Sequence, residues 1–236
     1  IAHLRRKELL LVLDNMEQIL DAAAFVRDVL AACPGVRIIA TSRERLHLRG
    51  EQRFRVAPLD LAAAVELFAA RAAAGAPDFA VTAANRSSVE QICRELDCLP
   101  LAIELCAAHV AVYTADALLA RLRDHRLDML ADGPSDLPVR HHTLANAIHR
   151  SYLLLTPQQQ NLLRWLAPFA GGFDENAVLF LGYAADDLKA LVDKSLVHVA
   201  VGQADDARYA LYATIRDYAR DRLVASAEET AAQRMH

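Results

Sequence analysis

The hydrophobic pattern at the start of the chain predicts buried strands. The first apolar run, Leu9–Leu13, has no polar alternation and ends at Asp14. Such a run is typical of a strand buried on both faces in a parallel sheet. A helical period follows over about residues 17–32, and a second apolar run occupies residues 36–41. We therefore expect a βαβ unit with a right-handed crossover, and a third short strand at about residues 52–56.

From residue 59 the apolar spacing becomes helical. Asp60 is placed to cap the first helix of this region, and Pro100 stands in the first turn of the third. Either Thr114 or Asp116 caps the fourth. The helices are expected at about residues 60–74, 85–96, 101–112 and 118–125. The pattern predicts a small helical domain over residues 59–130.

A segment of linker composition, residues 131–138, separates this region from a third one. Thr156 and Pro157 form a cap and first turn, and Thr214 is expected to cap the last helix. Helices are expected at about 142–155, 158–166, 175–181, 186–193 and 214–224, and strands at 196–201 and 208–212. This order predicts a winged-helix module.

Together these patterns give the fold class and its parts. We expect a mainly α chain with an α/β remnant at the N-terminus. The predicted domains are a partial parallel sheet over residues 1–58, a helical domain over 59–130 and a winged-helix domain over 131–236.

Composition narrows the classes of partner. The 236 residues are 54% hydrophobic, which is ample for a core, and the formal net charge is −4. A negative chain is a poor match for nucleic acid or a membrane surface, since both are anionic. No apolar stretch is long enough to span a bilayer, so we expect a cytoplasmic protein without a membrane partner.

Two strand ends carry the candidate chemistry. Asp14 ends the first strand, where a carboxylate can hold Mg²⁺ through water, because Mg²⁺ prefers oxygen ligands. The alternative is an ordinary strand-end or capping aspartate. Arg43 follows the second strand, where a guanidinium can bind a γ-phosphate. Its alternative is a surface salt bridge with Glu44 or Asp14.

The order of several motifs resembles the NB-ARC, or STAND, ATPases of bacterial LuxR-like and SARP-like transcriptional regulators. The segments that carry the resemblance lie in the family's order and span nearly the whole chain. They are the Walker B-like strand ending at Asp14, the sensor-like strand ending at Arg43, the Gly-Leu-Pro-Leu-like run 98–101, and the winged-helix signatures at 140–157, 169–173, 191–196 and 209–219.

The resemblance implies an ATP/ADP-dependent switch. It gives Asp14 the Mg²⁺ contact through water and Arg43 the role of γ-phosphate sensor, and it places Leu99 and Pro100 on the adenine side. There are departures from the family pattern. Cys98 stands where the family has glycine, and residues 211–213 lack the histidine and carboxylate of the family's Met-His-Asp motif.

The chain contains no Gly-x-x-x-x-Gly-Lys-Ser/Thr loop to cradle the phosphates. The resemblance places that loop ahead of residue 1 in a longer parent. We therefore expect ATP/ADP and Mg²⁺ to be cofactors of the parent and not of this chain, which alone should not hydrolyse ATP. The expected partners are the P-loop segment and the other domains of the parent, together with protein partners or self-association.

Two other functions remain open. One is a DNA-binding winged helix. Acidic residues oppose it, because Asp186, Asp187 and Asp193 accompany only Lys189 and Lys194 around the candidate recognition helix. The other is a catalytically inert scaffold for protein interaction.

Overall fold

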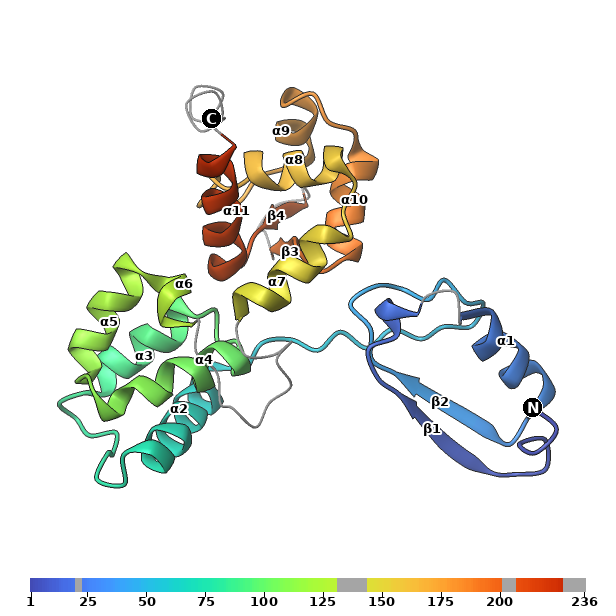
Figure 1. Cartoon of the computed structure of the whole chain (residues 1–236), viewed down its shortest axis with the longest axis horizontal. Helices are drawn as coiled ribbons and strands as arrows, with labels where there is room; N and C mark the ends of the chain where they lie inside the picture. Colours follow the sequence, from blue (N-terminus) through green and yellow to red (C-terminus); the bar gives the residue numbers. More distant parts are fainter. Residues whose placement is uncertain (20–22, 131–143, 201–206, 227–236) are drawn as a thin grey trace. The chain divides into compact units, whose positions relative to one another are not determined.

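The computed structural model describes residues 1–19, 23–130, 144–200 and 207–226. They form two compact units (Figure 1). The first comprises residues 1–55 and 192–195, and the second comprises residues 56–191 and 196–236. The described elements are mostly helices with two small two-stranded sheets, which confirms the mainly α fold class. The three predicted domain ranges stay a prediction.

The first unit is built on a parallel strand pair with one helix packed against it (Figure 1). The strands pair in register from Leu9 opposite Val36 to Leu13 opposite Ala40. A small core of Val29, Cys33 and Val36 holds the helix to the pair. The elements are β1 (Leu9–Leu13), the 3-10 turn η1 (Met16–Gln18), α1 (Ala23–Ala32) and β2 (Val36–Ala40).

One face of this strand pair is exposed, so the prediction of a strand buried on both faces is wrong for the described chain. The side chains of Leu10, Val12 and Ile39 are 56%, 66% and 54% exposed. Val12 and Ile39 are neighbours in the strand register. The reason is that α1 covers only the opposite face. An apolar, strand-forming sequence therefore presents its second face to solvent.

The strand predicted at residues 52–56 is also wrong. The segment has no strand assignment, and its residues are all exposed. Phe54 and Val56 are among the most exposed large apolar side chains of the described residues. A β-strand needs a neighbour for its hydrogen bonds, and the described residues supply none there.

The second unit begins with a helical part around its own core. Asp60 caps the first helix through the Ala63 N–H at 2.8 Å, as predicted, and Thr114 caps α5 through the Ala117 N–H at 3.4 Å. Phe68 and Leu105 are among the side chains that fill the core. The helices are α2 (Leu61–Gly75), α3 (Arg86–Glu95), α4 (Pro100–Ala107), the 3-10 turn η3 (Ala108–Ala111), α5 (Ala115–Asp124) and α6 (Arg126–Met129).

The rest of the second unit is the winged helix. Its hairpin pairs His198 with Ala210 in antiparallel register, and a bridge from Phe173 to Tyr209 adds a third strand position. Its elements are α7 (Leu144–Leu153), α8 (Pro157–Trp165), α9 (Glu175–Phe180), α10 (Ala185–Asp193), β3 (His198–Ala200), β4 (Arg208–Ala210) and α11 (Ala213–Ala225). The predicted linker 131–138 lies outside the described residues.

Two helix starts in the winged helix test the cap predictions. At α8, Thr156 and Gln159 form a reciprocal capping box, as a Thr-Pro start favours. At α11, the predicted Thr214 cap is wrong. The cap position is Tyr212, which makes no side-chain cap, and Thr214 is buried inside the first turn. The helix therefore begins before the position at which the sequence predicted its cap.

Among the described residues, none of the helices has the length and apolar character that crossing a membrane requires.

Candidate functional site

The carboxyl ends of β1 and β2 bring Asp14 and Asn15 beside Thr41. The hydroxyl of Thr41 donates to Asp14 Oδ1 and accepts the Asn15 N–H at 3.0 Å. Asn15 Nδ2 donates to Asp14 Oδ2 at 3.0 Å. Each carboxylate oxygen of Asp14 thus has one donor. Its orientation is set by groups from both strands.

Backbone conformation allows this cluster to close. Asn15 has φ of 59°, in the left-handed region that asparagine tolerates better than most residues. The chain therefore turns directly after β1. The Met16 N–H then donates to the Thr41 carbonyl at 3.0 Å, which ties the turn to the end of β2.

Arg43 pairs with Glu17 on the same edge. Arg43 Nε lies 3.6 Å from Glu17 Oε1, and the Arg43 N–H donates to Glu17 Oε2 at 3.4 Å. The Glu17 side chain is mostly buried, whereas that of Arg43 is partly exposed. Glu17 therefore contacts both the guanidinium of Arg43, at Nε, and its backbone N–H. Of the two hydroxyls after β2, Ser42 instead accepts the Glu44 N–H at 3.2 Å.

This edge offers oxygen ligands for a magnesium ion, but few of them. Asp14 is exposed, and a carboxylate with two hydrogen bonds keeps lone pairs free. In the part of the chain that the structure describes, no group of three or more His, Cys, Asp or Glu side chains could hold a metal. Asp14 therefore fits a contact through water, since Mg²⁺ usually keeps several waters and takes further ligands from phosphates.

The Leu-Pro segment lies in the second unit. Leu99 is the cap residue of α4, and Pro100 occupies its first position with an exposed ring. Cys98, which stands where the motif of the resembled family has glycine, has φ of 52°. That conformation is left-handed and favours glycine. The structure thus gives a backbone reason for glycine in this motif, and Cys98 carries the strain here.

A second polar group of residues, around Asp97 and Arg126, has no signal in the local sequence pattern. Asp97 Oδ2 accepts the Ala213 N–H at 2.6 Å, and Arg126 Nη1 lies 2.6 Å from Asp217 Oδ2. These contacts join residues about a hundred positions apart. No local spacing could predict them. A cavity of about 390 Å³ lies beside them, lined in part by Arg94, Glu95, His198 and Arg216.

The surface of the candidate recognition helix is acidic. Along α10, Asp186 is exposed and Asp187 is partly exposed, and Lys189 is an exposed base. Asp187 Oδ2 accepts from Gln158 Nε2 at 3.0 Å, so its charge is held at the start of α10. The wing turn lies mostly outside the described residues. This surface would repel DNA phosphates.

Comparisons with known proteins bear on the winged helix. Residues 155–224 match the family model described as a winged helix-turn-helix domain. The range runs from the start of α8 into α11, so it covers the elements described above from the capping box to the last helix. The match agrees with the winged-helix fold that these elements form.

Two mycobacterial proteins are similar over most of this chain. "Putative HTH-type transcriptional regulator Rv0890c" of Mycobacterium tuberculosis is 42% identical over 232 residues, which are 94% of this chain and 26% of that protein. "Uncharacterized protein Rv0894" of the same organism is 38% identical over 233 residues, 94% of this chain and 59% of that protein. The chain thus spans about a quarter of the first relative's length.

A solved structure is similar at a lower level. The signal transduction ATPase with numerous domains (STAND) from Pyrococcus horikoshii, which has a tetratricopeptide repeat sensor, aligns with 14% identity and a TM-score of 0.35. The alignment covers 100% of this chain and 31% of that one. A TM-score of this size does not establish a common overall fold.

Proposed function

We propose that this chain is part of an ATP/ADP-dependent switch of the STAND class in a bacterial transcriptional regulator, whose other segments supply the phosphate-binding loop. The hydrogen-bonded pair of Asp14 and Thr41 at the carboxyl edge of β1 and β2 carries the proposal. Ligands of parallel α/β sheets bind outside this edge. The similarity to a mycobacterial protein named as a transcriptional regulator supports transcription as the process that the switch would control.

In this proposal each strand-end residue has a distinct task. Asp14 orients water on Mg²⁺, and Thr41 and Asn15 hold its carboxylate in place. Arg43 reads the γ-phosphate while Glu17 positions it. Leu99 and Pro100 border the adenine. Bound Mg²⁺ would neutralise phosphate charge, and this chain alone lacks the lysine and backbone cradle for the phosphates.

The exposed sheet face also supports a larger sheet in the parent. Leu10, Val12 and Ile39 form an apolar surface on a parallel pair, and parallel sheets in proteins are covered on both faces. We propose that further strands and helices of the parent complete this sheet. The partners of the chain would then include those segments first, before any separate protein.

Nucleotide titration tests the proposal in two proteins. Isothermal titration with Mg-ATP should give no measurable heat with the 236-residue chain and micromolar binding with the longer parent. In the parent, Asp14→Asn should weaken the dependence of binding on Mg²⁺, and Arg43→Ala should reduce the preference for ATP over ADP. Matched controls are Asp28→Asn and Arg27→Ala, a surface ion pair of α1 in the same unit.

If Asp14→Asn and Arg43→Ala leave nucleotide binding and transcriptional output of the parent unchanged, the proposal of a nucleotide switch is wrong. An inert scaffold would then explain the chain better. Micromolar Mg-ATP binding by the 236-residue chain itself would contradict only the proposal that it needs the missing loop.

Direct DNA binding is the second candidate, because the matched family model is a winged helix-turn-helix domain. The acidic exposed surface of α10 argues against it. We expect no gel shift with this chain at low salt, where phosphate contacts are strongest. A shift that weakens steeply with added salt would favour the DNA-binding function instead.

A further inference from the structure

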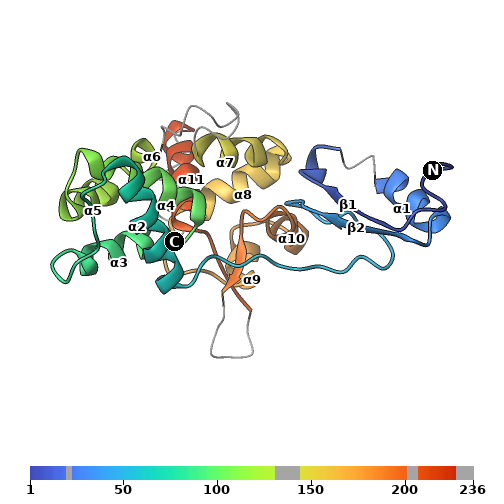
Figure 2. The same ribbon diagram turned by 90° about the horizontal axis from the view of Figure 1, so that it is seen from below.

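The second unit holds a polar joint between its helical part, α2–α6, and its winged-helix part, α7–α11. The core of the helical part is built from side chains of residues 64–130. Among the described residues, Leu144 is the one apolar side chain beyond residue 130 that packs against this core. Helix α11 nevertheless lies beside α6 as well as beside α7 and α8 (Figure 1, Figure 2). Polar contacts therefore hold much of α11 against the helical part.

Arg126 is at the centre of the joint. It is the first residue of α6, and its side chain is only 9% exposed. Its Nη2 lies 2.7 Å from Glu95 Oε2 in the helical part, and its Nη1 lies 2.6 Å from Asp217 Oδ2 on α11. A guanidinium presents its donors in a rigid fork, so one side chain can hold two carboxylates at once. Arg126 thus bridges the two parts.

Asp97 makes the second contact across the joint. It lies in the turn between α3 and α4, with φ of 53°, and its Oδ2 accepts the N–H of Ala213 at 2.6 Å. Ala213 is the first residue of α11, whose own cap residue, Tyr212, supplies no side-chain cap. A carboxylate also opposes the positive end of the helix dipole. The helical part therefore caps the last helix of the winged-helix part.

Charge makes these two contacts depend on each other. Glu95, Asp97 and Asp217 bring three carboxylates toward one joint, and Arg126 pairs directly with two of them. Without the guanidinium, these carboxylates would repel one another. Loss of Arg126 should therefore weaken the Asp97 contact as well, although Arg126 does not touch Ala213.

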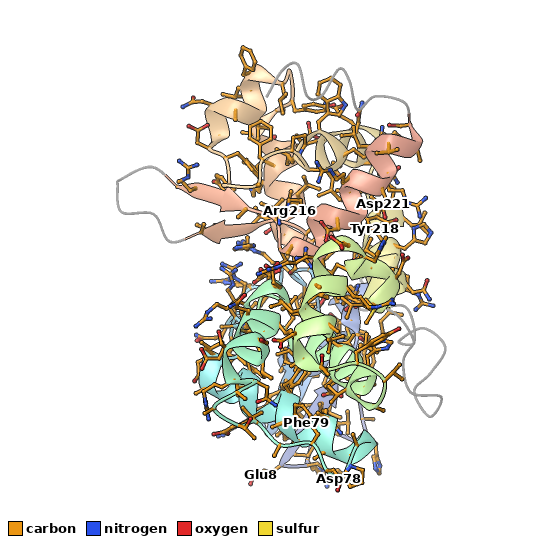
Figure 3. The ribbon with its side chains drawn as sticks, turned by 90° about the vertical axis from the view of Figure 1, so that its left-hand side faces the viewer. Glu8, Asp78, Phe79, Arg216, Tyr218 and Asp221 are labelled. Carbon is orange, nitrogen blue, oxygen red and sulfur yellow. The ribbon has the colours of Figure 1, made fainter. Side chains whose placement is uncertain are left out.

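A cavity adjoins the joint. The cavity of about 390 Å³ beside it is lined by both parts, including Arg94 and Asp97 from one and His198 and Arg216 from the other. Figure 3 shows Arg216, Tyr218 and Asp221 along α11. Dissolved salt can therefore reach Glu95 and Asp97, which line the cavity, and the partly exposed Asp217.

We propose that Arg126 closes an electrostatic latch between the helical part and the winged-helix part, and that the latch opens while both parts stay folded. Opening breaks the contacts of Arg126 with Asp217 and of Asp97 with Ala213. It frees the first turn of α11 and widens the adjoining cavity. The device needs no nucleotide, so it stands apart from the proposed switch at Asp14.

Hydrogen exchange of the Ala213 amide, followed by NMR on the whole chain, reads the latch directly. In Asp217→Asn, Arg126 keeps its partner Glu95, so the helical part is undisturbed. We expect the Ala213 amide to exchange at least about tenfold faster in this variant, as for loss of one partner of a poorly exposed ion pair. The amides in the middle of α3 and α8 should keep their wild-type protection.

Arg126→Gln should produce the same loss of protection at the Ala213 amide. The double variant Arg126→Gln/Asp217→Asn should lose no more protection than the more affected single variant, because both substitutions act through one contact. The matched control is Arg123→Gln. Arg123 also pairs with Glu95, at 3.4 Å, but within the helical part, and it is 52% exposed. Arg123→Gln should leave the exchange rate of the Ala213 amide unchanged.

Added salt gives an independent reading. Raising sodium chloride from low concentration to about 1 M should speed exchange at Ala213 more in the wild type than in Asp217→Asn, since the variant lacks the ion pair of Arg126 with Asp217 that salt screens. Unchanged exchange at Ala213 in Asp217→Asn overturns the latch. So does an equal loss of protection in α3 and α8, which would make the pair a general structural contact.

Discussion

At the residue scale, backbone conformation at Cys98 leads to a prediction about its replacement. A side chain in the left-handed region costs about 1 kcal/mol relative to glycine. We therefore expect Cys98→Gly to be more stable than Cys98→Ala by about 1 kcal/mol, since both remove the thiol and only alanine keeps the strain. Urea unfolding of the two variants measures the difference.

Cys106 gives the matched control for this comparison. It lies inside α4, where alanine is favoured over glycine by about 1 kcal/mol. The order of the two variants should therefore reverse at position 106. Equal stability of the glycine and alanine variants at position 98 would show that the left-handed conformation there is not strained.

A second residue-scale prediction concerns pH. Burial raises the pKa of Asp97 above its usual value, although the Ala213 N–H, Arg126 and Arg216 favour the charged form and Asp217 opposes it. The folded chain thus binds this proton more tightly than the unfolded chain. The stability that Asp97 contributes falls as the pH rises through its raised pKa in the folded chain. It is recovered as the pH falls toward the pKa of Asp97 in the unfolded chain.

Asp97→Asn keeps the acceptor for Ala213 and tolerates the left-handed turn, but it removes the buried charge. We expect the variant to be at least as stable as the wild type at neutral pH, with the advantage shrinking as the pH is lowered through the raised pKa. Urea unfolding at several pH values measures this. A constant difference across that range would contradict the role of burial at Asp97.

At the element scale, local signals in the sequence were reliable where the cause was local. The Asp60 and Thr156 caps and Pro100 in the first turn of α4 all occur as predicted. The cap at Thr214 failed because the helix begins earlier, where Asp97 from another segment supplies the acceptor. A contact between residues 116 positions apart leaves no pattern in the local sequence.

The same distinction applies to the candidate site. The ends of β1 and β2 place Asp14 beside Thr41 because parallel strands bring their carboxyl ends to one edge, which the sequence predicts. The pairing of Arg43 with Glu17 depends on how the following turns fold, and the sequence left it open. The placement of Leu99 and Pro100 beside a nucleotide stays a prediction.

The capping box of α8 leads to a prediction at the same scale. Thr156 Oγ1 accepts the Gln159 N–H at 3.3 Å, and Gln159 Oε1 accepts the Thr156 N–H at 3.1 Å. Thr156→Ala should lower the free energy of unfolding by about 1 kcal/mol. Thr156→Ser keeps the hydroxyl, and serine caps helices at least as well as threonine, so its free energy of unfolding should stay closer to that of the wild type. Thermal unfolding of both variants checks the order, and equal losses would point to the threonine methyl group instead.

At the scale of the whole molecule, the exposed face of β1 and β2 is where the described chain departs most from its own sequence pattern. The strands have the composition of buried ones, yet Leu10, Val12 and Ile39 face solvent. Continuous apolar strands of this kind occur in parallel sheets that are covered on both faces. The exposed face is therefore consistent with the larger sheet that we propose for the parent.

The effect of Val12→Thr on the free energy of unfolding, measured in the 236-residue chain and in the longer parent, tests whether this face is covered in the parent. In the 236-residue chain Val12 is largely exposed, so the variant should change the free energy of unfolding by less than about 0.5 kcal/mol. In the longer parent the same side chain would be covered, and a buried hydroxyl without a partner should lower the free energy of unfolding by about 1–3 kcal/mol. Leu11→Thr is the control, because Leu11 packs against the α1 side of the sheet and should destabilise both proteins. A Val12→Thr effect that is equally small in both would mean that this face stays open in the parent, and the proposed larger sheet would be wrong.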